Sequence, residues 1–267
     1  MKKRHSRKKV IAVLVTVTAV CIITILFIML LLKSYEEKLS ENTKEDISRE
    51  QDYVKEINID DSQNEIQEDE EKEPEILSEY KDLYDQNNEL YGWLKIDDTI
   101  IDYPVMHTPD DPQKYLYLGF NEEDDIAGTL FMDYRDTKDS DNLIIYGHNM
   151  KNMTMFGSLP DYKDISFYEE HPVIHFDTLY EKQDYEVAYA FYDQIYSEDD
   201  TEHFKYYHYI DAEDEEEYDN AIQYFAERSV YDTGITPEYG DQLIMLITCA
   251  YHVEDGRFVV VARKIEE

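Results

Sequence analysis

Short apolar runs separated by turn-forming residues occupy most of the chain after residue 90. The runs are rich in β-branched and aromatic residues, and Gly, Pro, Asp and Asn lie between them. Runs of this length and composition are typical of strands, and eight of them in succession favour an all-β barrel or sandwich. The predicted strands are residues 91–96, 99–106, 127–134, 142–148, 171–177, 183–195, 241–249 and 257–265.

Two other segments carry the helical period. The first lies within residues 76–87, and its apolar positions are Ile76, Leu77, Tyr80, Leu83 and Tyr84. The second lies at about residues 213–229, and its apolar face is formed by Tyr218, Ala221, Ile222 and Phe225. The acidic first turn of the second helix and Arg228 near its end both match the helix dipole. The sequence therefore predicts a mainly-β fold, a barrel with an N-terminal helix and a helix inserted before the strand that ends in Cys249.

Residues 10–32 form an uncharged apolar run near the N-terminus. As a helix this run would be roughly 35 Å long, enough to cross a bilayer core of about 30 Å. The alternative is a cleaved secretory signal, but signal peptides have a shorter apolar region and end in a small-residue cleavage pattern. The run ends in MLLLKSYEE and lacks that pattern. We therefore expect an uncleaved transmembrane helix.

Charge on either side of this run predicts its orientation. Six Lys and Arg residues precede it, and acidic residues follow it. The positive-inside rule then keeps the N-terminus in the cytoplasm and places the rest outside the cell. The predicted organisation is a cytoplasmic basic tail (1–9), a transmembrane helix (10–32), an acidic extracellular spacer (33–75) and a folded domain (76–267). We therefore expect a single-pass protein of the cell membrane whose folded domain is extracellular.

Composition narrows the possible functions. The formal net charge is −37, which disfavours binding to nucleic acid, and 25 tyrosines indicate a packed core rather than disorder. Residues 33–75 are rich in acidic and amide side chains and poor in large apolar ones, so we expect a solvated spacer. Calcium binding is the alternative for this segment, but no D-x-[DN]-x-[DN]-G spacing occurs in it.

The two cysteines have different surroundings. Cys21 lies in the apolar run, and Cys249 ends the seventh predicted strand. In an external domain Cys249 would then have no partner within the chain. A lone thiol there is a buried spectator, half of an intermolecular disulfide or a nucleophile. The chemistry of cysteine alone leaves these three readings open.

Two residues near strand ends could serve such a nucleophile. His148 follows the apolar strand NLIIYG, and Arg257 opens the strand after Cys249. A histidine can exchange protons and an arginine can hold a carbonyl oxygen, so the three side chains form a possible Cys–His–Arg site. His252 is a rival base in the connecting loop, and we rank it below His148. Arg257 could instead pair with Glu254 or Asp255 across the turn.

Three motifs in this order resemble the sortases, the membrane-anchored cysteine transpeptidases of Gram-positive bacteria, and specifically class B. LITCAYHVEDGR is similar to the family's Leu-x-Thr-Cys motif with an arginine eight residues after the cysteine. LIIYGHNMKNMTMFGSL is similar to the histidine motif and the short helix behind it. GTLFMDYR and NELYGWLKI are similar to core strands of class B, and the helix at 213–229 is where class B has one. The resemblance covers residues 76–265 and implies a sortase-like barrel of eight strands.

The resemblance also implies a transpeptidation in two steps. Cys249, as a thiolate, would attack a threonine carbonyl in the C-terminal sorting signal of a secreted protein, while His148 would protonate the departing amine. Arg257 would hold the carbonyl oxygen or the adjacent peptide. An amine of a peptidoglycan precursor or of a pilin would then resolve the thioester, and neither a metal nor an organic cofactor is implied. Substrate-binding residues would be Thr248, Ile247 and Tyr251.

Two departures from the family pattern concern the substrate. Ile247 stands where relatives often carry a serine that can line the substrate groove, and Asp110-Asp111-Pro112 stands where they often carry an asparagine. Two other function classes remain open on the sequence. One is an extracellular cysteine peptidase with water as acceptor, and the other is a non-catalytic surface ectodomain in which Cys249 is buried.

Overall fold

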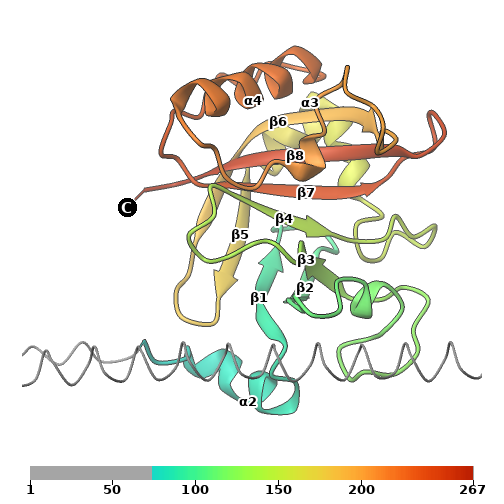
Figure 1. Cartoon of the computed structure of the whole chain (residues 1–267). Helices are drawn as coiled ribbons and strands as arrows, with labels where there is room; N and C mark the ends of the chain where they lie inside the picture. The colour runs from blue at the N-terminus through green and yellow to red at the C-terminus, as the bar shows by residue number, and fades with distance from the viewer. Residues whose placement is uncertain (1–73, 267) are drawn as a thin grey trace, which may run out of the picture. The chain divides into compact units, whose positions relative to one another are not determined.

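Strands form at all eight predicted positions and close into a barrel in the order β1-β2-β3-β4-β7-β8-β6-β5 (Figure 1). The computed structural model describes residues 74–266. The strands are β1 (Leu90–Lys95), β2 (Asp102–Met106), β3 (Leu130–Met132), β4 (Asn142–Tyr146), β5 (Val173–Thr178), β6 (Asp184–Gln194), β7 (Leu243–Cys249) and β8 (Gly256–Lys264). The predicted mainly-β fold class is confirmed.

Both predicted helices are also present. The helices of the described residues are α2 (Ser78–Gln86), α3 (Ile165–Glu170) and α4 (Glu215–Arg228), with short 3-10 turns η1 (Lys114–Leu116), η2 (Leu159–Lys163) and η3 (Tyr206–His208). α4 begins where the side chain of Asp214 accepts a hydrogen bond of 3.0 Å from the backbone N–H of Glu217. Figure 1 shows α4 packed along the outside of the barrel, before the chain enters β7.

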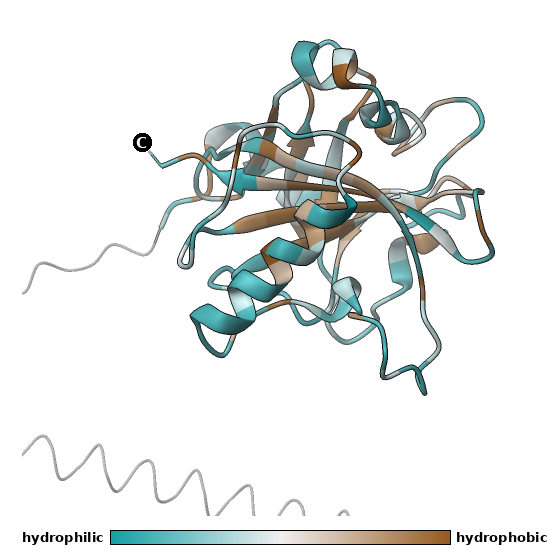
Figure 2. Ribbon diagram, turned by 90° about the horizontal axis from the view of Figure 1, so that it is seen from above, coloured by the Kyte–Doolittle hydropathy of each residue, from teal (hydrophilic) through white to brown (hydrophobic). Residues whose placement is uncertain are grey.

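β7 is apolar along its whole length because both of its faces are buried. Ile244 and Leu246 lie in the core inside the barrel. Met245 and Ile247 alternate with them and pack on the outside, in a second cluster that includes Phe225 of α4. Figure 2 shows the apolar strands crossing the middle of the domain, with polar residues on the outer side of α4. The unbroken apolar run in the sequence thus reflects a strand covered on two sides.

Strand pairing around β7 mixes two directions. β7 pairs in parallel with β4 and antiparallel with β8. A second parallel pair joins β2 and β3. Because parallel neighbours need a long connection, the segment from β4 to β7 passes through α3, β5, β6 and α4 before it returns to β4. The end of β4 and the end of β7 therefore reach the same edge of the barrel.

The predicted membrane localisation requires correction. Between residues 74 and 266, no helix is long and apolar enough to cross a membrane. The apolar run at 10–32, on which the prediction of a single-pass anchor depended, lies outside the described residues, as do the basic tail and nearly all of the acidic spacer. The single-pass localisation has no support in the structure and forms no part of the function proposed below.

A buried carboxyl group holds β4 in place. Asp136 is almost completely buried, and its Oδ2 accepts a hydrogen bond of 2.8 Å from the backbone N–H of Ile144. Its other oxygen has no hydrogen-bond partner among the described residues. Burial raises the pKa of Asp136 to about 8, which the hydrogen bond from Ile144 only partly offsets. The neutral acid is therefore the form that fits this site.

We expect Asp136 to make stability fall as the pH rises. In the unfolded chain an aspartate has a pKa of about 3.9, so between about pH 4 and about pH 8 the folded state binds more protons than the unfolded state. The contribution of Asp136 is complete below this range and is lost as the pH passes the folded-state pKa. Asp136→Asn keeps an acceptor oxygen but cannot titrate. Urea unfolding across this range should show a flatter pH dependence for the variant, and two parallel curves would contradict the assignment.

Gly147 follows β4 at a point where no side chain fits. A Cβ atom there would lie 2.5 Å from Cδ2 of Leu130 and 2.6 Å from Cδ2 of Phe156. Both neighbours are fully buried and cannot move aside. The backbone that leads to His148 therefore passes directly over the core of the barrel.

Substitution of Gly147 should disturb the fold and the end of β4 together. We expect Gly147→Ala to lower the free energy of unfolding by about 1–3 kcal/mol, because the added methyl group overpacks a filled core. Gly119→Ala is the matched control, since a Cβ there would have its nearest neighbours at 3.8 Å. Chemical denaturation measures both variants, and equal stabilities for the two would show that the crowding at Gly147 is relieved without cost.

Candidate active site

The ends of β4 and β7 bring His148 and Cys249 to one place. Tyr146 and Ile247 are register partners in the parallel pair, and His148 and Cys249 each lie two residues further along. The two chains stay together beyond the strands, because the N–H of Gly147 donates to the carbonyl of Ile247 at 3.2 Å. The strand pairing thus juxtaposes two residues that lie about 100 positions apart in the sequence.

Arg257 is the direct neighbour of Cys249 on the other side. The two residues are register partners in the antiparallel pair of β7 and β8, which confirms the predicted return of the chain. The N–H of Ala250 donates to the carbonyl of Gly256 at 2.9 Å and closes the connecting loop. Gly256 permits this closure, because a Cβ at this position would lie 2.4 Å from the carbonyl oxygen of Ala250.

Cys249 and Arg257 lie on the outer face of the barrel. Ile247 packs outward against the α4 cluster, and side chains two residues apart on a strand share a face, so Cys249 faces the same way. Register partners also share a face, which places Arg257 there. Cys249 is partly exposed and forms no disulfide within the described residues. These surroundings differ from those of a buried spectator thiol.

His148 is oriented by a backbone carbonyl. Its Nε2 lies 2.9 Å from the carbonyl oxygen of Leu116, and the ring of Tyr117 packs beside it with centroids 5.6 Å apart. A carbonyl oxygen can only accept a hydrogen bond, so Nε2 carries the proton in this contact. This leaves Nδ1 as the nitrogen that can give and take a proton elsewhere.

Asn149 is a residue of the site that the sequence analysis did not select. Its Nδ2 donates to the carbonyl oxygen of Cys249 at 2.8 Å. The bond ties the loop that carries His148 to the end of the strand that carries the thiol. The asparagine is visible in the histidine motif, but its acceptor is a backbone atom 100 residues away, so no local pattern identifies the contact.

The three predicted substrate-binding residues lie in different surroundings. Thr248 is buried, and its Oγ1 donates to the carbonyl of Gly147 at 2.8 Å. Ile247 is 1% exposed within the α4 cluster and offers no surface to a substrate. Tyr251 is 81% exposed in the loop after Cys249. Of the three, Tyr251 is the side chain that a ligand on the outer face could contact.

The competing assignments for Arg257 and His252 can be compared with their contacts. In the described part of the chain, Nη1 of Arg257 donates to the backbone carbonyls of Asp255 and Gly256, at 3.1 and 2.9 Å, rather than to a carboxylate. His252 is exposed and packs edge-on against Tyr192, with ring centroids 4.9 Å apart. His148 therefore remains the histidine that the strand pairing places beside Cys249.

Comparisons with known proteins agree with this arrangement. The family described as Sortase domain matches residues 94–265. Sortase B of Listeria monocytogenes is 33% identical over 197 residues, which cover 72% of this chain and 76% of that protein. Sortase B of Bacillus anthracis in complex with AAEK1 superimposes with a TM-score of 0.63 at 34% identity, over 72% of this chain and 86% of that one. A Staphylococcus aureus sortase B–substrate complex gives 0.63 at 31% identity, over 72% and 87%.

The matched region contains every strand from the end of β1 to the end of β8, and with them His148, Cys249 and Arg257. Both the curated relative and the solved structures exceed 30% identity over more than two thirds of this chain. The shared region is thus the barrel and the strand ends that form the site. The chain belongs to the sortase family of cysteine transpeptidases, in class B.

Proposed function

We propose that this chain cleaves the C-terminal sorting signal of other proteins after a threonine and transfers the acyl-protein to an amine. The observation that carries the proposal is the strand register. It places Arg257 beside Cys249 on one side, and it brings the end of β4 with His148 to the other side. A solved relative is described as a sortase B–substrate complex, which supports a substrate-binding site on this fold.

In the first step the Cys249 thiolate attacks the threonine carbonyl carbon, and a C–S bond forms. Arg257 donates hydrogen bonds to the carbonyl oxygen as negative charge develops on it. The peptide C–N bond then breaks, and the imidazolium of His148 gives its proton to the departing amine. The products are a thioester on Cys249 and the released C-terminal peptide.

In the second step an amine attacks the thioester, and neutral His148 accepts the proton that the amine loses. The C–S bond breaks, the thiolate is restored, and the threonine carbonyl ends in a new amide bond. We propose an amine of a peptidoglycan precursor or of a pilin as the acceptor. Tyr251, exposed in the loop beside the thiol, is the residue we propose to contact the bound peptide.

The nucleophile can be tested by trapping the thioester. We expect the full-length chain to form an acyl-enzyme with a threonine-containing sorting-signal peptide, and Cys249→Ala to form none, as measured by intact-protein mass spectrometry. Cys21→Ala removes the other cysteine of the chain and should leave the adduct in place. An undiminished adduct on Cys249→Ala would refute the assignment. Turnover with triglycine present separates transpeptidation from hydrolysis, and release of hydrolysed peptide alone would favour a peptidase.

The roles of His148 and Arg257 predict large losses without unfolding. We expect His148→Ala to lower kcat/KM by about 10²- to 10⁴-fold, the usual worth of general acid–base catalysis. Arg257→Lys keeps the positive charge but lacks the fork of donors, so it should also lose activity. Arg263→Lys, on the same strand and at its far end, is the matched control. Wild-type rates for either site variant would remove that residue from the proposed mechanism.

A further inference from the structure

Arg257 has a carboxylate as its other strand neighbour. Asp193 of β6 is the register partner of Arg257 across the antiparallel pair of β6 and β8. Cys249, Arg257 and Asp193 therefore form one row across three adjacent strands, with their side chains on the same face. Asp193 is only 8% exposed, so its charge is poorly screened by water.

The same two strands contain a second carboxylate and arginine in register, and these two do form an ion pair. At their other end Glu186 and Arg263 are also register partners, and they form an ion pair with Nε of Arg263 3.0 Å from Oε1 of Glu186. In the described residues Arg257 instead donates to backbone carbonyls of its own loop. Other contacts must therefore explain why Asp193 and Arg257 do not form an ion pair.

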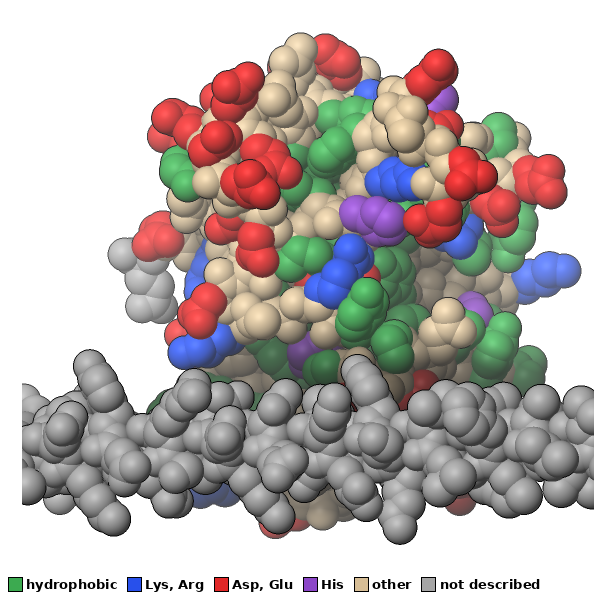
Figure 3. Space-filling view, viewed as in Figure 1, with side chains coloured by type: hydrophobic (Ala, Val, Ile, Leu, Met, Phe, Trp, Pro, Cys, Tyr) green, Lys and Arg blue, Asp and Glu red, His purple; other side chains and the backbone are tan. Residues whose placement is uncertain are grey.

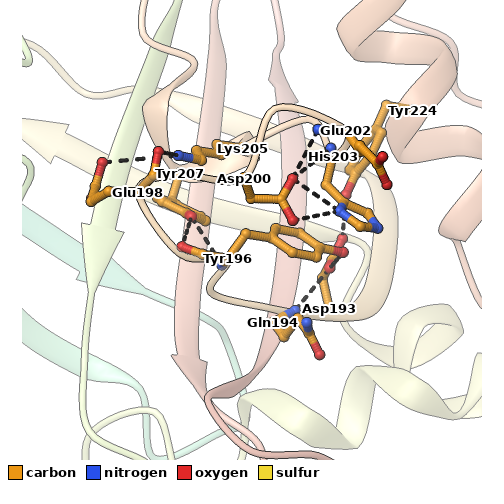
Figure 4. A network of polar contacts seen from close by, with 10 residues as sticks. All are labelled: Asp193, Gln194, Tyr196, Glu198, Asp200, Glu202, His203, Lys205, Tyr207 and Tyr224. Carbon is orange, nitrogen blue, oxygen red and sulfur yellow. Dashed lines mark hydrogen bonds and ion pairs between the residues drawn. The ribbon is translucent and has the colours of Figure 1, made fainter.

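The carboxylate of Asp193 already accepts hydrogen bonds from other groups (Figure 4). Tyr196 donates its hydroxyl to Oδ1 at 2.8 Å, and Tyr224 donates its hydroxyl to Oδ2 at 2.6 Å. The backbone N–H of Gln194 also donates to Oδ1, at 2.8 Å. The positive partner is Arg228 of α4, whose Nε lies 3.2 Å from Oδ2. Its guanidinium is also 3.5 Å from the centroid of the Tyr224 ring.

The charges of Asp193 and Arg257 both affect the pKa of the buried Tyr206 hydroxyl. Burial raises the pKa of the Tyr206 hydroxyl, the charge of Asp193 raises it further, and the charge of Arg257 opposes the rise. The hydroxyl has no hydrogen-bond partner among the described residues. The buried Tyr206 hydroxyl therefore lies within reach of both charges.

We propose that Arg228 is a positioning residue of the reaction: it holds and neutralises Asp193, so that Arg257 stays available for the substrate carbonyl. This inference rests on the proposed role of Arg257. Loss of Arg228 would leave a buried carboxylate with hydrogen-bond donors but no cation. Arg257, its register partner, would then turn toward it, as Arg263 does toward Glu186.

Carboxylates are common on the described surface near α4. The chain has 62 acidic and 25 basic residues. Figure 3 shows acidic side chains over much of the part of this face that carries α4, with few basic ones between them. Because Arg228 pairs with Asp193, the buried carboxylate in register with Arg257 already has a positive partner.

The test is a double-mutant series on the full-length chain with a sorting-signal peptide and triglycine. We expect Arg228→Gln to lower kcat/KM roughly three- to tenfold, because Asp193 captures Arg257 in most molecules. Asp193→Asn combined with Arg228→Gln should restore kcat/KM to nearly the wild-type value. Arg228→Lys should retain most of the activity. A purely structural role for Arg228 would leave the double variant as impaired as the single one.

Controls separate this inference from the proposed function. Arg263→Gln breaks an ion pair on the same strand away from the site and should leave kcat/KM unchanged. Arg228→Met, which keeps the aliphatic packing on Tyr224, takes the place of Arg228→Gln if that variant does not fold. Full activity of either variant, or no restoration by Asp193→Asn, would overturn the inference. Absence of turnover by the wild type, or full activity of Arg257→Ala, would instead defeat the proposed function.

Discussion

The site depends on the pairing of β7 with two neighbours that run in different directions. Its parallel pairing with β4 brings the end of the histidine strand beside Cys249, and its antiparallel pairing with β8 brings Arg257 to the other side. A shift of one residue in either register would turn the side chains to the opposite face of the sheet. Burial of β7 on both faces opposes such a shift, because every alternative places core residues against the wrong neighbours.

Much of this fold can be predicted from local pattern. The strands and the two amphipathic helices follow from periodicity, because each is selected by the burial of one or both of its faces. The parallel pairing of β4 with β7 could not be predicted in that way, since periodicity says which residues are buried but not which strands are neighbours. The motif resemblance indicated Cys249, His148 and Arg257 together because their order and spacing are those of a known family.

The residues that sequence reasoning missed or misplaced act through distant partners. Asn149 donates to a backbone carbonyl, and Asp193 lies on a strand whose apolar pattern gives no reason to select it. Ile247 was expected in a substrate groove because it replaces a serine, yet it is buried against α4. Its orientation depends on which face of β7 the helix covers, and that follows from the position of α4 in three dimensions rather than from the strand itself.

The loop between Cys249 and Arg257 is less constrained than the strands that it joins. Tyr251 to Asp255 are exposed, while the register that places the arginine beside the thiol is maintained by the paired strands. The entropy of closing a loop rises only slowly with its length, by about 0.6 kcal/mol for each doubling. Insertions here would change the exposed surface beside Cys249 while the paired strands keep Cys249 and Arg257 in register. In evolution, this loop can therefore vary in length and sequence while Cys249 and Arg257 remain side by side.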